Sequence, residues 1–518
     1  MSNDERPIAA IATALAPAAL AAIRLSGDRA VDLLAARFSR PQALRRASGH
    51  TMHHGSILDA EGRAVDEVLV ALYRRPRSYT GEESAEVFCH GSPAGVRRVL
   101  AVLLASGFAA ARPGEFTRRA FLNGRLDLTR AEAVNEIVNA HTARAHALAL
   151  DRLEGSVEAA VREVRAELIA TMAQLAIQLD YPEEETGPVE VDAGRLRRAG
   201  ERARSIASTY GRGRLFQEGV RVAIAGRTNA GKSALFNRLL RHDRSIVSDV
   251  HGTTRDYVEA LIDVEGVPVR LFDTAGLRTA GEAIEEEGIR RSRTIIAASD
   301  LVIYVVDSAQ GLTEEDASRL AEIRRTTPAL VVLNKADLVS AGLGSDAGRN
   351  DTDGVAGRDG PAARGDAAVG EAAVGEAAVG EAAVAVSAFT GDGLETLNAR
   401  LLDALLEGAG AQETVAGAAT ADATSTVAAA GSATARGGPG ARRSGVREPV
   451  IDSERQHALL LRAAGAIERT LESLEAGVSA DAVAVDLQDA LDAVGEITGE
   501  VASAEILDAM FGSFCVGK

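Results

Sequence analysis

The sequence predicts a multidomain protein of α/β plus α class, in which an α/β domain is inserted into a helical bundle. Three observations lead to this prediction. Short apolar runs separated by turns fill residues 1–120, and strand and helix patterns alternate over residues 218–339. A helical period occupies two separate stretches, about 126–210 and from 452 onward. Because neither helical stretch is expected to close a core alone, we expect them to form one discontinuous bundle.

Residues 1–124 are expected to form an N-terminal α+β domain. The runs IAAIAT from Ile8, DEVLVALY from Asp66 and SAEVFCHG from Ser84 have the pattern of strands. The segment PAGVRRVLAVLLASG, residues 93–107, has a helical pattern that Gly107 ends. Cys89 lies within the third strand pattern, so we expect it in the core.

The helical domain is expected in two parts, residues 125–217 and 447–518. Apolar residues recur at helical spacing in both parts, as shown by Leu168, Met172, Leu175 and Leu179 and by Leu460, Ile467, Leu471 and Leu474. Between the parts we expect an α/β domain over 218–407, with an insert at about 341–383, and a linker over 408–446. The insert repeats GEAAV and the linker is rich in Ala, Gly, Thr and Ser. Both lack the apolar density that offsets ordering entropy, so we expect both to be disordered.

Composition narrows the classes of function. The 518 residues carry a net charge of −17, which argues against a general electrostatic grip on nucleic acid, and we expect no DNA partner. Four arginines are close in sequence, namely Arg112, Arg118, Arg119 and Arg125. Two interpretations of them are open: a local basic patch, or a solvated helix end rich in arginine. The chain has two cysteines, and it shows neither a signal-like N-terminus nor a long apolar run. These features predict a cytoplasmic protein without a membrane partner. The histidines at 53, 54 and 90 lack metal-ligand spacing, so we expect no zinc site.

The segment GRTNAGKS, residues 226–233, matches the phosphate-binding P-loop. It follows the apolar run 222–225 and opens an amphipathic helix, which is the context this motif needs. The two glycines let backbone N–H groups face the phosphates, and the helix N-terminus adds partial positive charge. Lys232 is expected to reach the β- and γ-phosphates, and the Ser233 hydroxyl to bind Mg²⁺.

The other elements of a GTP site follow in order. Asp337 of the NKAD segment is expected to accept hydrogen bonds from guanine, which adenine could not donate. Ser387 and Ala388 lie in the loop expected to close over the base, Asp273 is expected to hold Mg²⁺ through water, and Thr253 and Thr254 form the γ-phosphate switch. The full predicted GTP-binding set is Asn229, Ala230, Gly231, Lys232, Ser233, Ala234, Ser248, Asp249, Val250, His251, Gly252, Thr253, Thr254, Asp273, Thr274, Ala275, Gly276, Asn334, Lys335, Ala336, Asp337, Ser387, Ala388 and Phe389.

One catalytic residue of Ras-type GTPases is absent. Those enzymes place a Gln after the Asp-Thr-Ala-Gly turn to orient the attacking water, whereas this chain has Leu277. The amide oxygen of Asn229, with backbone carbonyls of the switch, could instead cage K⁺ where an arginine finger otherwise places its charge. Four carboxylates past the turn compete to orient water, namely Glu282, Glu285, Glu286 and Glu287.

The chain resembles the tRNA-modification GTPases of the MnmE (TrmE) family over most of its length. The resemblance rests on the motifs SYTGEESAEVFCHGSP, ARPGEFTRRAFLNGRLDLTRAEAV, LDYPEEE, GRTNAGKS, VHGTTRD, DTAGLR and the terminal FCVGK. It implies a Ras-like GTPase domain that dimerises across its nucleotide face, with Glu285 orienting water. It also implies the metal ligands, which are Ser233 and Thr254 for Mg²⁺ and Asn229, Ser248, Val250 (main chain) and Thr253 for K⁺.

The resemblance further implies a homodimer that joins an FAD- and NADH-dependent partner subunit in a heterotetramer. Together they would add an aminomethyl-type group (carboxymethylaminomethyl) to C5 of the wobble uridine of certain tRNAs. The N-terminal domain would bind 5,10-methylene- or 5-formyl-tetrahydrofolate through Arg24, Glu86, Arg125 and Lys518. The chain departs from the family at residues 14–21, where ALAPAALA replaces PGRGGVG, and at Arg125, where the family has Lys.

Cys515, in the terminal motif, has two interpretations. The family motif implies a catalytic thiol, whereas the alternative is that the cysteine packs the tail so that Lys518 reaches the folate site. For the whole chain, two further functions compete with tRNA modification. One is a GTP-switched, RNA-binding module of ribosome assembly, and the other is a scaffold that binds GTP without turnover.

Overall fold

The computed structural model describes residues 6–180, 191–242, 258–273, 290, 293–338, 383–417 and 448–518. The chain divides into two compact units. One comprises Met1–Asn139, Leu148–Ser208 and Arg443–Lys518, and the other comprises Ala140–Ala147 and Thr209–Arg442. Within the described residues, no helix has both the length and the apolar character that crossing a bilayer requires.

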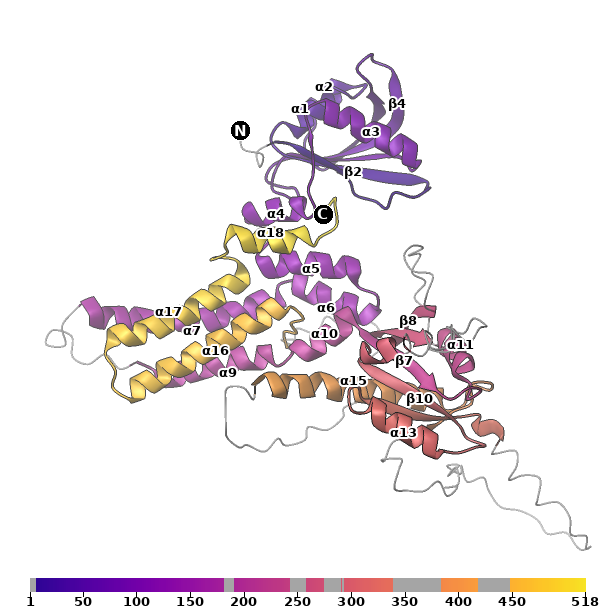
Figure 1. Cartoon of the computed structure of the whole chain (residues 1–518). Helices are drawn as coiled ribbons and strands as arrows, with labels where there is room; N and C mark the ends of the chain where they lie inside the picture. The colour runs from indigo at the N-terminus through magenta and orange to yellow at the C-terminus, as the bar shows by residue number, and fades with distance from the viewer. Residues whose placement is uncertain are drawn as a thin grey trace, which may run out of the picture. The chain divides into compact units, whose positions relative to one another are not determined.

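The first unit begins with a six-stranded sheet in the order β3-β4-β5-β2-β1-β6 (Figure 1). Its elements are β1 Ile8–Ile11, β2 Leu20–Ser26, α1 Ala30–Ala35, α2 Pro41–Arg46, β3 Thr51–Leu58, β4 Ala64–Tyr73, β5 Ser84–His90, α3 Pro93–Ala105 and β6 Ala109–Ala110. The three strands and the helix expected from sequence are therefore confirmed. Helix α3 packs against the sheet, and Gly107 follows it with φ +116°, a conformation that L side chains rarely adopt. Cys89 is 1% exposed in this core, as expected.

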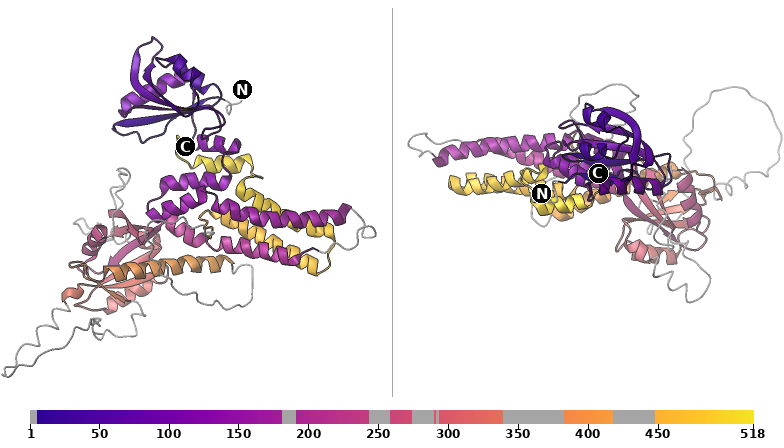
Figure 2. Two further views of the ribbon diagram at one scale, coloured as in Figure 1. Left: turned by 180° about the vertical axis from the view of Figure 1, so that it is seen from behind. Right: turned by 90° about the horizontal axis from the view of Figure 1, so that it is seen from above.

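The helical bundle completes the first unit and uses both sequence segments, as predicted. Its helices are α4 Glu115–Leu122, α5 Leu128–Asn139, α6 Ala143–Leu153, α7 Ser156–Asp180, α9 Ala193–Ala207, α16 Glu454–Glu475, α17 Ala480–Thr498 and α18 Ala504–Gly512. Helix α16 packs against α17 and α9, and α17 packs against α7, so each half covers the apolar stripe of the other (Figures 1 and 2). Leu168, Leu175, Leu460 and Ile467 of the predicted stripes are all buried.

A buried ionic cluster also joins the two halves of the bundle. Arg152 of α6 is 2% exposed and donates to Glu136 of α5 at 2.6 Å and to Asp452 at 2.8 Å. It also donates to the carbonyl of Val450 at 3.2 Å. Burial, reinforced by the charge of Asp452, raises the pKa of Glu136 from 4.5 to about 8, although Arg152 acts to lower it. The guanidinium therefore holds two buried carboxylates from distant parts of the sequence.

Replacing Arg152 with Ala is expected to lower the free energy of unfolding by about 3 kcal/mol, because two buried carboxylates then lose the guanidinium they share. A carboxyl whose pKa is raised by folding contributes stability that is present below its ordinary pKa and lost as pH rises through the folded value. The variant's deficit is therefore expected to be larger at pH 8 than at pH 5 in urea unfolding followed by circular dichroism. Arg162→Ala, which removes an arginine that is 69% exposed, is the control and should cost less than about 1 kcal/mol. An equal cost for both variants would contradict the prediction.

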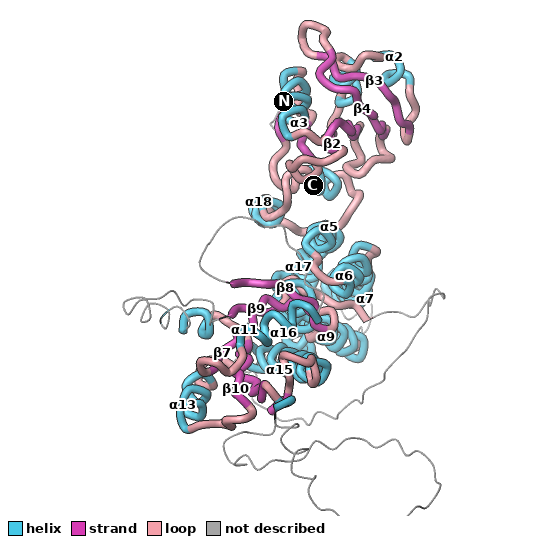
Figure 3. Tube along the Cα trace, turned by 90° about the vertical axis from the view of Figure 1, so that its right-hand side faces the viewer, coloured by secondary structure: helices cyan, strands magenta, loops and turns pink. Residues whose placement is uncertain are grey.

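The second unit contains a six-stranded sheet in the order β12-β11-β10-β7-β9-β8, parallel except for the β8–β9 pair (Figure 3). Its elements are α10 Tyr210–Glu218, β7 Val220–Gly226, α11 Lys232–His242, β8 Val258–Val264, β9 Val267–Asp273, β10 Leu301–Asp307, α13 Glu314–Ile323, β11 Ala329–Asn334, β12 Ala383–Ala385 and α15 Leu394–Gly417. The alternation of strand and helix expected over 218–339 is confirmed. The buried strand β10 forms the middle of the core.

Two boundaries differ from those expected. Residues 140–147 and 209–217 group with this second unit, where Thr142 donates to the carbonyl of Gly266 at 2.7 Å and the Arg144 guanidinium lies 4.1 Å from the ring centroid of Phe216. Helix α15 continues to Gly417, ten residues past the expected end of the domain at 407. Its Ala- and Leu-rich sequence has high helix propensity, which allows the helix to extend. Most of the predicted insert and linker, 341–382 and 418–446, lies outside the described residues.

Candidate functional site

The loop between β7 and α11 has the geometry that a phosphate site requires. Gly226, Asn229 and Gly231 all have positive φ, at 138°, 63° and 93°. A Cβ on Gly231 would lie 2.2 Å from Nδ2 of Asn334, and one on Gly226 would lie 2.2 Å from the carbonyl oxygen of Val305. Both positions therefore require glycine for space as well as for backbone conformation. The N-terminus of α11 begins at Lys232, directly after this loop.

The Lys232 ammonium and the Ser233 hydroxyl lie at the mouth of this loop. Lys232 donates to the carbonyls of Gly226 at 2.9 Å and Arg227 at 2.6 Å, so its charge lies over the loop. Ser233 donates to the Asp273 carboxylate at 2.8 Å, and Asp273, at the end of β9, is 5% exposed. A hydroxyl and a carboxylate are hard oxygen donors of the kind that Mg²⁺ prefers. The described residues therefore fit a Mg²⁺–phosphate group.

The predicted base-recognition residues form one hydrogen-bonded group at the ends of β11 and β12. Asn334 donates to the carbonyl of Ala230 at 3.0 Å and accepts from the N–H of Ala388 at 3.0 Å, so it ties the phosphate loop to the closing loop. Ser387 donates to Asp337 at 2.6 Å. These bonds orient the Asp337 carboxylate, which is the group expected to read guanine.

An ion pair involves Lys335, the residue that follows Asn334. Lys335, with φ 65°, places its ammonium 2.7 Å from the carboxylate of Asp307 at the end of β10. Although burial acts to raise it, the pKa of Asp307 is lowered because this carboxylate accepts hydrogen bonds from Lys335 and from the N–H of Ala309. Phe389, by contrast, is 86% exposed and contributes no packing to the base loop in this state.

The rest of the predicted nucleotide site lies outside the described residues. This holds for Ser248, Asp249, Val250, His251, Gly252, Thr253, Thr254, Thr274, Ala275, Gly276 and Glu285. Of the expected K⁺ ligands only Asn229 is described, and its side chain is exposed with no hydrogen bond to any described residue. Its amide oxygen is therefore available to a cation. Ala234, the last residue of the predicted phosphate set, lies in the first turn of α11.

Three of the four predicted folate residues lie close together in the first unit. Arg24 of β2 is paired with Glu86 of β5 at 3.0 Å, and it also donates to the carbonyl of Gly517 at 3.1 Å. Burial and the nearby charge of Arg24 lower the pKa of Lys518. Two cations and a carboxylate thus meet at the C-terminal tail, a combination suited to a ligand with both acidic and donor groups.

The C-terminal tail is held by aromatic packing and backbone hydrogen bonds. Phe511 and Phe514 are buried against Phe121 and Leu128. The N–H of Phe116 donates to a main-chain carboxylate oxygen of Lys518 at 3.2 Å. The Cys515 side chain is exposed, so the interpretation that this cysteine packs the tail is wrong. Phenylalanine anchors the tail instead, because it buries more apolar area.

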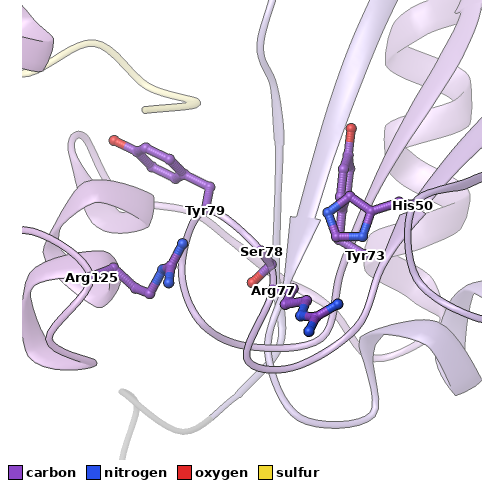
Figure 4. Close-up of a pocket in the computed structure, with 6 residues that line it drawn as sticks. All are labelled: His50, Tyr73, Arg77, Ser78, Tyr79 and Arg125. Atoms are coloured by element: carbon purple, nitrogen blue, oxygen red, sulfur yellow. The ribbon is translucent and has the colours of Figure 1, made fainter.

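Arg125 lines a separate cavity of about 350 Å³ with five residues that the sequence analysis did not identify (Figure 4). They are His50, Tyr73, Arg77, Ser78 and Tyr79. The signal was present in the sequence, since Arg77, Ser78 and Tyr79 directly precede or begin the motif SYTGEESAE. Only the fold shows that His50, from the turn before β3, reaches the same cavity.

Three of the four clustered arginines lie beside carboxylates, and the fourth, Arg125, lines the cavity described above. Arg119 is 5% exposed and pairs with Glu115 at 2.9 Å and Glu82 at 3.3 Å. Arg112 lies 3.8 Å from Glu115, and Arg118 lies 3.8 Å from Asp508. Among the described residues, no group of three or more His, Cys, Asp or Glu side chains is arranged to hold a metal ion.

Two family models match the chain. The model of the MnmE helical domain matches residues 128–515, and the model of the GTP-binding protein TrmE N-terminus matches residues 7–125. The first match runs from α5 through the inserted domain to α18, which agrees with one bundle built from two sequence segments.

Proteins named tRNA modification GTPase MnmE are similar to the chain over its full length. The protein of Treponema denticola is 37% identical, covering 99% of this chain and 98% of the relative. That of Moorella thermoacetica is 37% identical, covering 99% of each. Among solved structures, the G domain of the T. maritima FeoB iron transporter is 23% identical and covers 37% of this chain and 98% of that one, with a TM-score of 0.21. That score is too low to support any inference about the present chain.

Proposed function

The chain belongs to the MnmE family of tRNA modification GTPases and is a GTP hydrolase, and we propose that it modifies the wobble uridine of certain tRNAs. The modification would be an aminomethyl-type group, carboxymethylaminomethyl, on C5 of that base. GTP hydrolysis by this chain is supported above all by the hydrogen bonds of Asn334 to Ala230 and Ala388. These bonds join the phosphate loop to the loops expected to read guanine.

In the proposed nucleotide site, each described residue has a physical role. Lys232 neutralises charge on the β- and γ-phosphates, while Ser233 and Asp273 supply oxygen atoms toward Mg²⁺. Asp337 accepts from the guanine N1–H and N2 amine. Glu285 is proposed to orient the attacking water, which accounts for Leu277 in place of the usual Gln. A bound K⁺ would supply positive charge at the transferring phosphoryl group, with Asn229, Ser248, Val250 and Thr253 as its proposed ligands.

The first unit is proposed to bind the tetrahydrofolate that donates the one-carbon unit. The grouping of Arg24, Glu86 and Lys518 around the C-terminal tail supports this assignment, and Arg125 contributes from the neighbouring cavity. The active assembly is proposed to be a homodimer that joins an FAD- and NADH-dependent partner subunit. Because its side chain is exposed, Cys515 is accessible to substrate, and a catalytic role for its thiol is part of the proposal.

A GTP-switched module of ribosome assembly is disfavoured by the extent of the family match. The helical and N-terminal models together span residues 7–125 and 128–515, so the similarity is not confined to the GTPase domain. In addition, most of the arginines that might have formed an RNA-binding patch are paired with carboxylates.

Deleting the gene for this chain is expected to remove the C5 modification from wobble uridines, because the relatives that carry the same domains are tRNA modification enzymes. Mass spectrometry of nucleosides from purified tRNA measures this directly. Restoring the wild-type chain should restore the modified nucleoside, whereas Asp337→Asn should not. Unchanged tRNA nucleosides, together with ribosomal RNA captured by the chain at high affinity, would favour the ribosome-assembly function instead.

A further inference from the structure

The cavity lined by His50, Tyr73, Arg77, Ser78, Tyr79 and Arg125 has no role in the functions described so far, apart from the contribution of Arg125 (Figure 4). We propose that it binds the γ-linked glutamate tail of a folate polyglutamate, with Arg77 as the residue that selects for a long tail. This inference rests on the proposed folate-dependent function, and it adds a subsite and a preference that the four predicted folate residues do not supply.

The lining of the cavity carries positive charge. None of its six lining residues is acidic, although acidic residues outnumber basic ones in the chain as a whole, 74 to 57. Within the described part of the chain, the guanidinium groups of Arg77 and Arg125 form no hydrogen bond or ion pair. The arginines next to Arg77 differ, since Arg74 pairs with Glu83 and Arg75 with Asp28. Two guanidinium groups that face a cavity with no carboxylate partner are suited to bind an anionic ligand.

The cavity lies near the Arg24–Glu86 pair. Tyr79 lines it, and the Arg24 guanidinium lies 5.5 Å from the centroid of the Tyr79 ring. Tyr73 lines it as well, and burial, reinforced by the charge of Glu86, raises the pKa of this phenol. The two tyrosines thus connect the cavity to the Arg24–Glu86 pair. A ligand whose head contacts that pair would extend its tail over Tyr79 toward Arg125 and Arg77.

The part of the lining formed by His50, Tyr73 and Ser78 is held by ring packing and hydrogen bonds. His50 has φ +62°, a strained conformation for a histidine, and its ring packs edge-on against Tyr73 with 5.5 Å between centroids. Its N–H donates to the carbonyl of Leu72 at 2.7 Å, which ties the strained turn to β4. Ser78 is buried at the base of the loop and donates to the carbonyl of Glu82 at 2.6 Å. Figure 4 shows Arg125 and Tyr79 on one side of Ser78, with Arg77 and His50 on the other.

The chemistry favours a peptide-like carboxylate chain over RNA. The planar guanidinium binds a carboxylate through two parallel hydrogen bonds, and successive γ-linked glutamates present one such carboxylate per residue. A volume of about 350 Å³ is in the range of small-molecule sites. A surface that follows an RNA backbone would need more cations, and the nearby Arg118 and Arg119 are directed to carboxylates.

The test is a calorimetric titration of the purified full-length chain with 5-formyl-tetrahydrofolate as the monoglutamate and as the triglutamate. An exposed ion pair typically contributes a factor of roughly 2 to 5 in affinity, so two such pairs predict about tenfold tighter binding of the triglutamate. Arg77→Ala removes one of the two pairs, so it should lower this preference to about threefold while changing the affinity for the monoglutamate less than about twofold. Arg97→Ala, which removes an exposed arginine of α3 outside the cavity, should keep the preference. Raising the salt concentration should reduce the preference in the wild-type chain.

The possible failures are distinguishable. Equal affinity of the wild-type chain for both folates, or an unchanged ratio in Arg77→Ala, would overturn the tail subsite and leave the folate assignment standing. Absence of binding of either folate would overturn the folate assignment, and the subsite with it. If Arg77→Ala weakens tRNA binding and leaves the folate ratio unchanged, the cavity belongs to an RNA surface and the tail proposal is wrong.

Discussion

Replacing Asp337 with Asn is expected to lower kcat/KM for GTP by about 1,000-fold, because a site built to accept hydrogen bonds from the base then presents a donor instead. The same variant should gain activity toward xanthosine triphosphate, whose ring carries a carbonyl where guanine carries its N2 amine. Ser387 holds the Asp337 carboxylate in place at 2.6 Å, so the substituted amide should keep the same position. Steady-state hydrolysis of both nucleotides measures the change in specificity.

Asp392→Asn is the matched control for this experiment. It removes one carboxylate from the same closing loop, where Asp392 accepts from Thr390 at 2.7 Å, and it should leave the preference for GTP unchanged. A gain toward xanthosine triphosphate separates altered recognition from misfolding, since an unfolded variant would hydrolyse neither nucleotide. Retention of GTP preference by Asp337→Asn would show that another group reads the base.

Hydrolysis of GTP is expected to be about 100-fold faster in KCl than in NaCl at matched ionic strength, because a cation at the transferring phosphoryl group replaces the charge of an arginine finger. Asn229→Ala should lose this difference and hydrolyse slowly in both salts. The Asn229 side chain is exposed and forms no hydrogen bond within the described residues, so its loss breaks no contact, while alanine at φ 63° adds backbone strain of about 1 kcal/mol.

Asn237→Ala provides the control for the loss of an amide. Asn237 lies on the exposed face of α11 in the same unit, and its replacement should leave the response to K⁺ intact. Binding of a fluorescent GDP should be similar for both variants, which would assign the effect to the hydrolytic step. Equal rates of the wild-type chain in KCl and NaCl would exclude the cation cage.

The apolar runs over 1–120, the alternation of strand and helix over 218–339 and the two helical periods were sufficient to predict the classes of both units. They were sufficient because apolar periodicity reports which face of a local segment is buried. The same local information did not identify the buried Arg152, whose partners Glu136 and Asp452 lie in different halves of the bundle. From the same local information, the inserted domain was expected to end at 407, before α15 ends at Gly417. The difference arises because no strong stop signal distinguishes a helical Ala-rich segment from a linker.

The sequence by itself determined the phosphate loop, the NKAD base-recognition segment and the family, because each depends on residue types at short, fixed spacing. Only the tertiary structure determines which of those segments contact one another. Asn334 joins Ala230 to Ala388 across three loops, and Arg24 contacts Glu86 and the carbonyl of Gly517 near the C-terminus. It alone also brought His50, Arg77 and Arg125 to one cavity. These contacts depend on strand order and on the docking of the C-terminal tail, which are set by the packing of the whole unit and have no local signature in the chain.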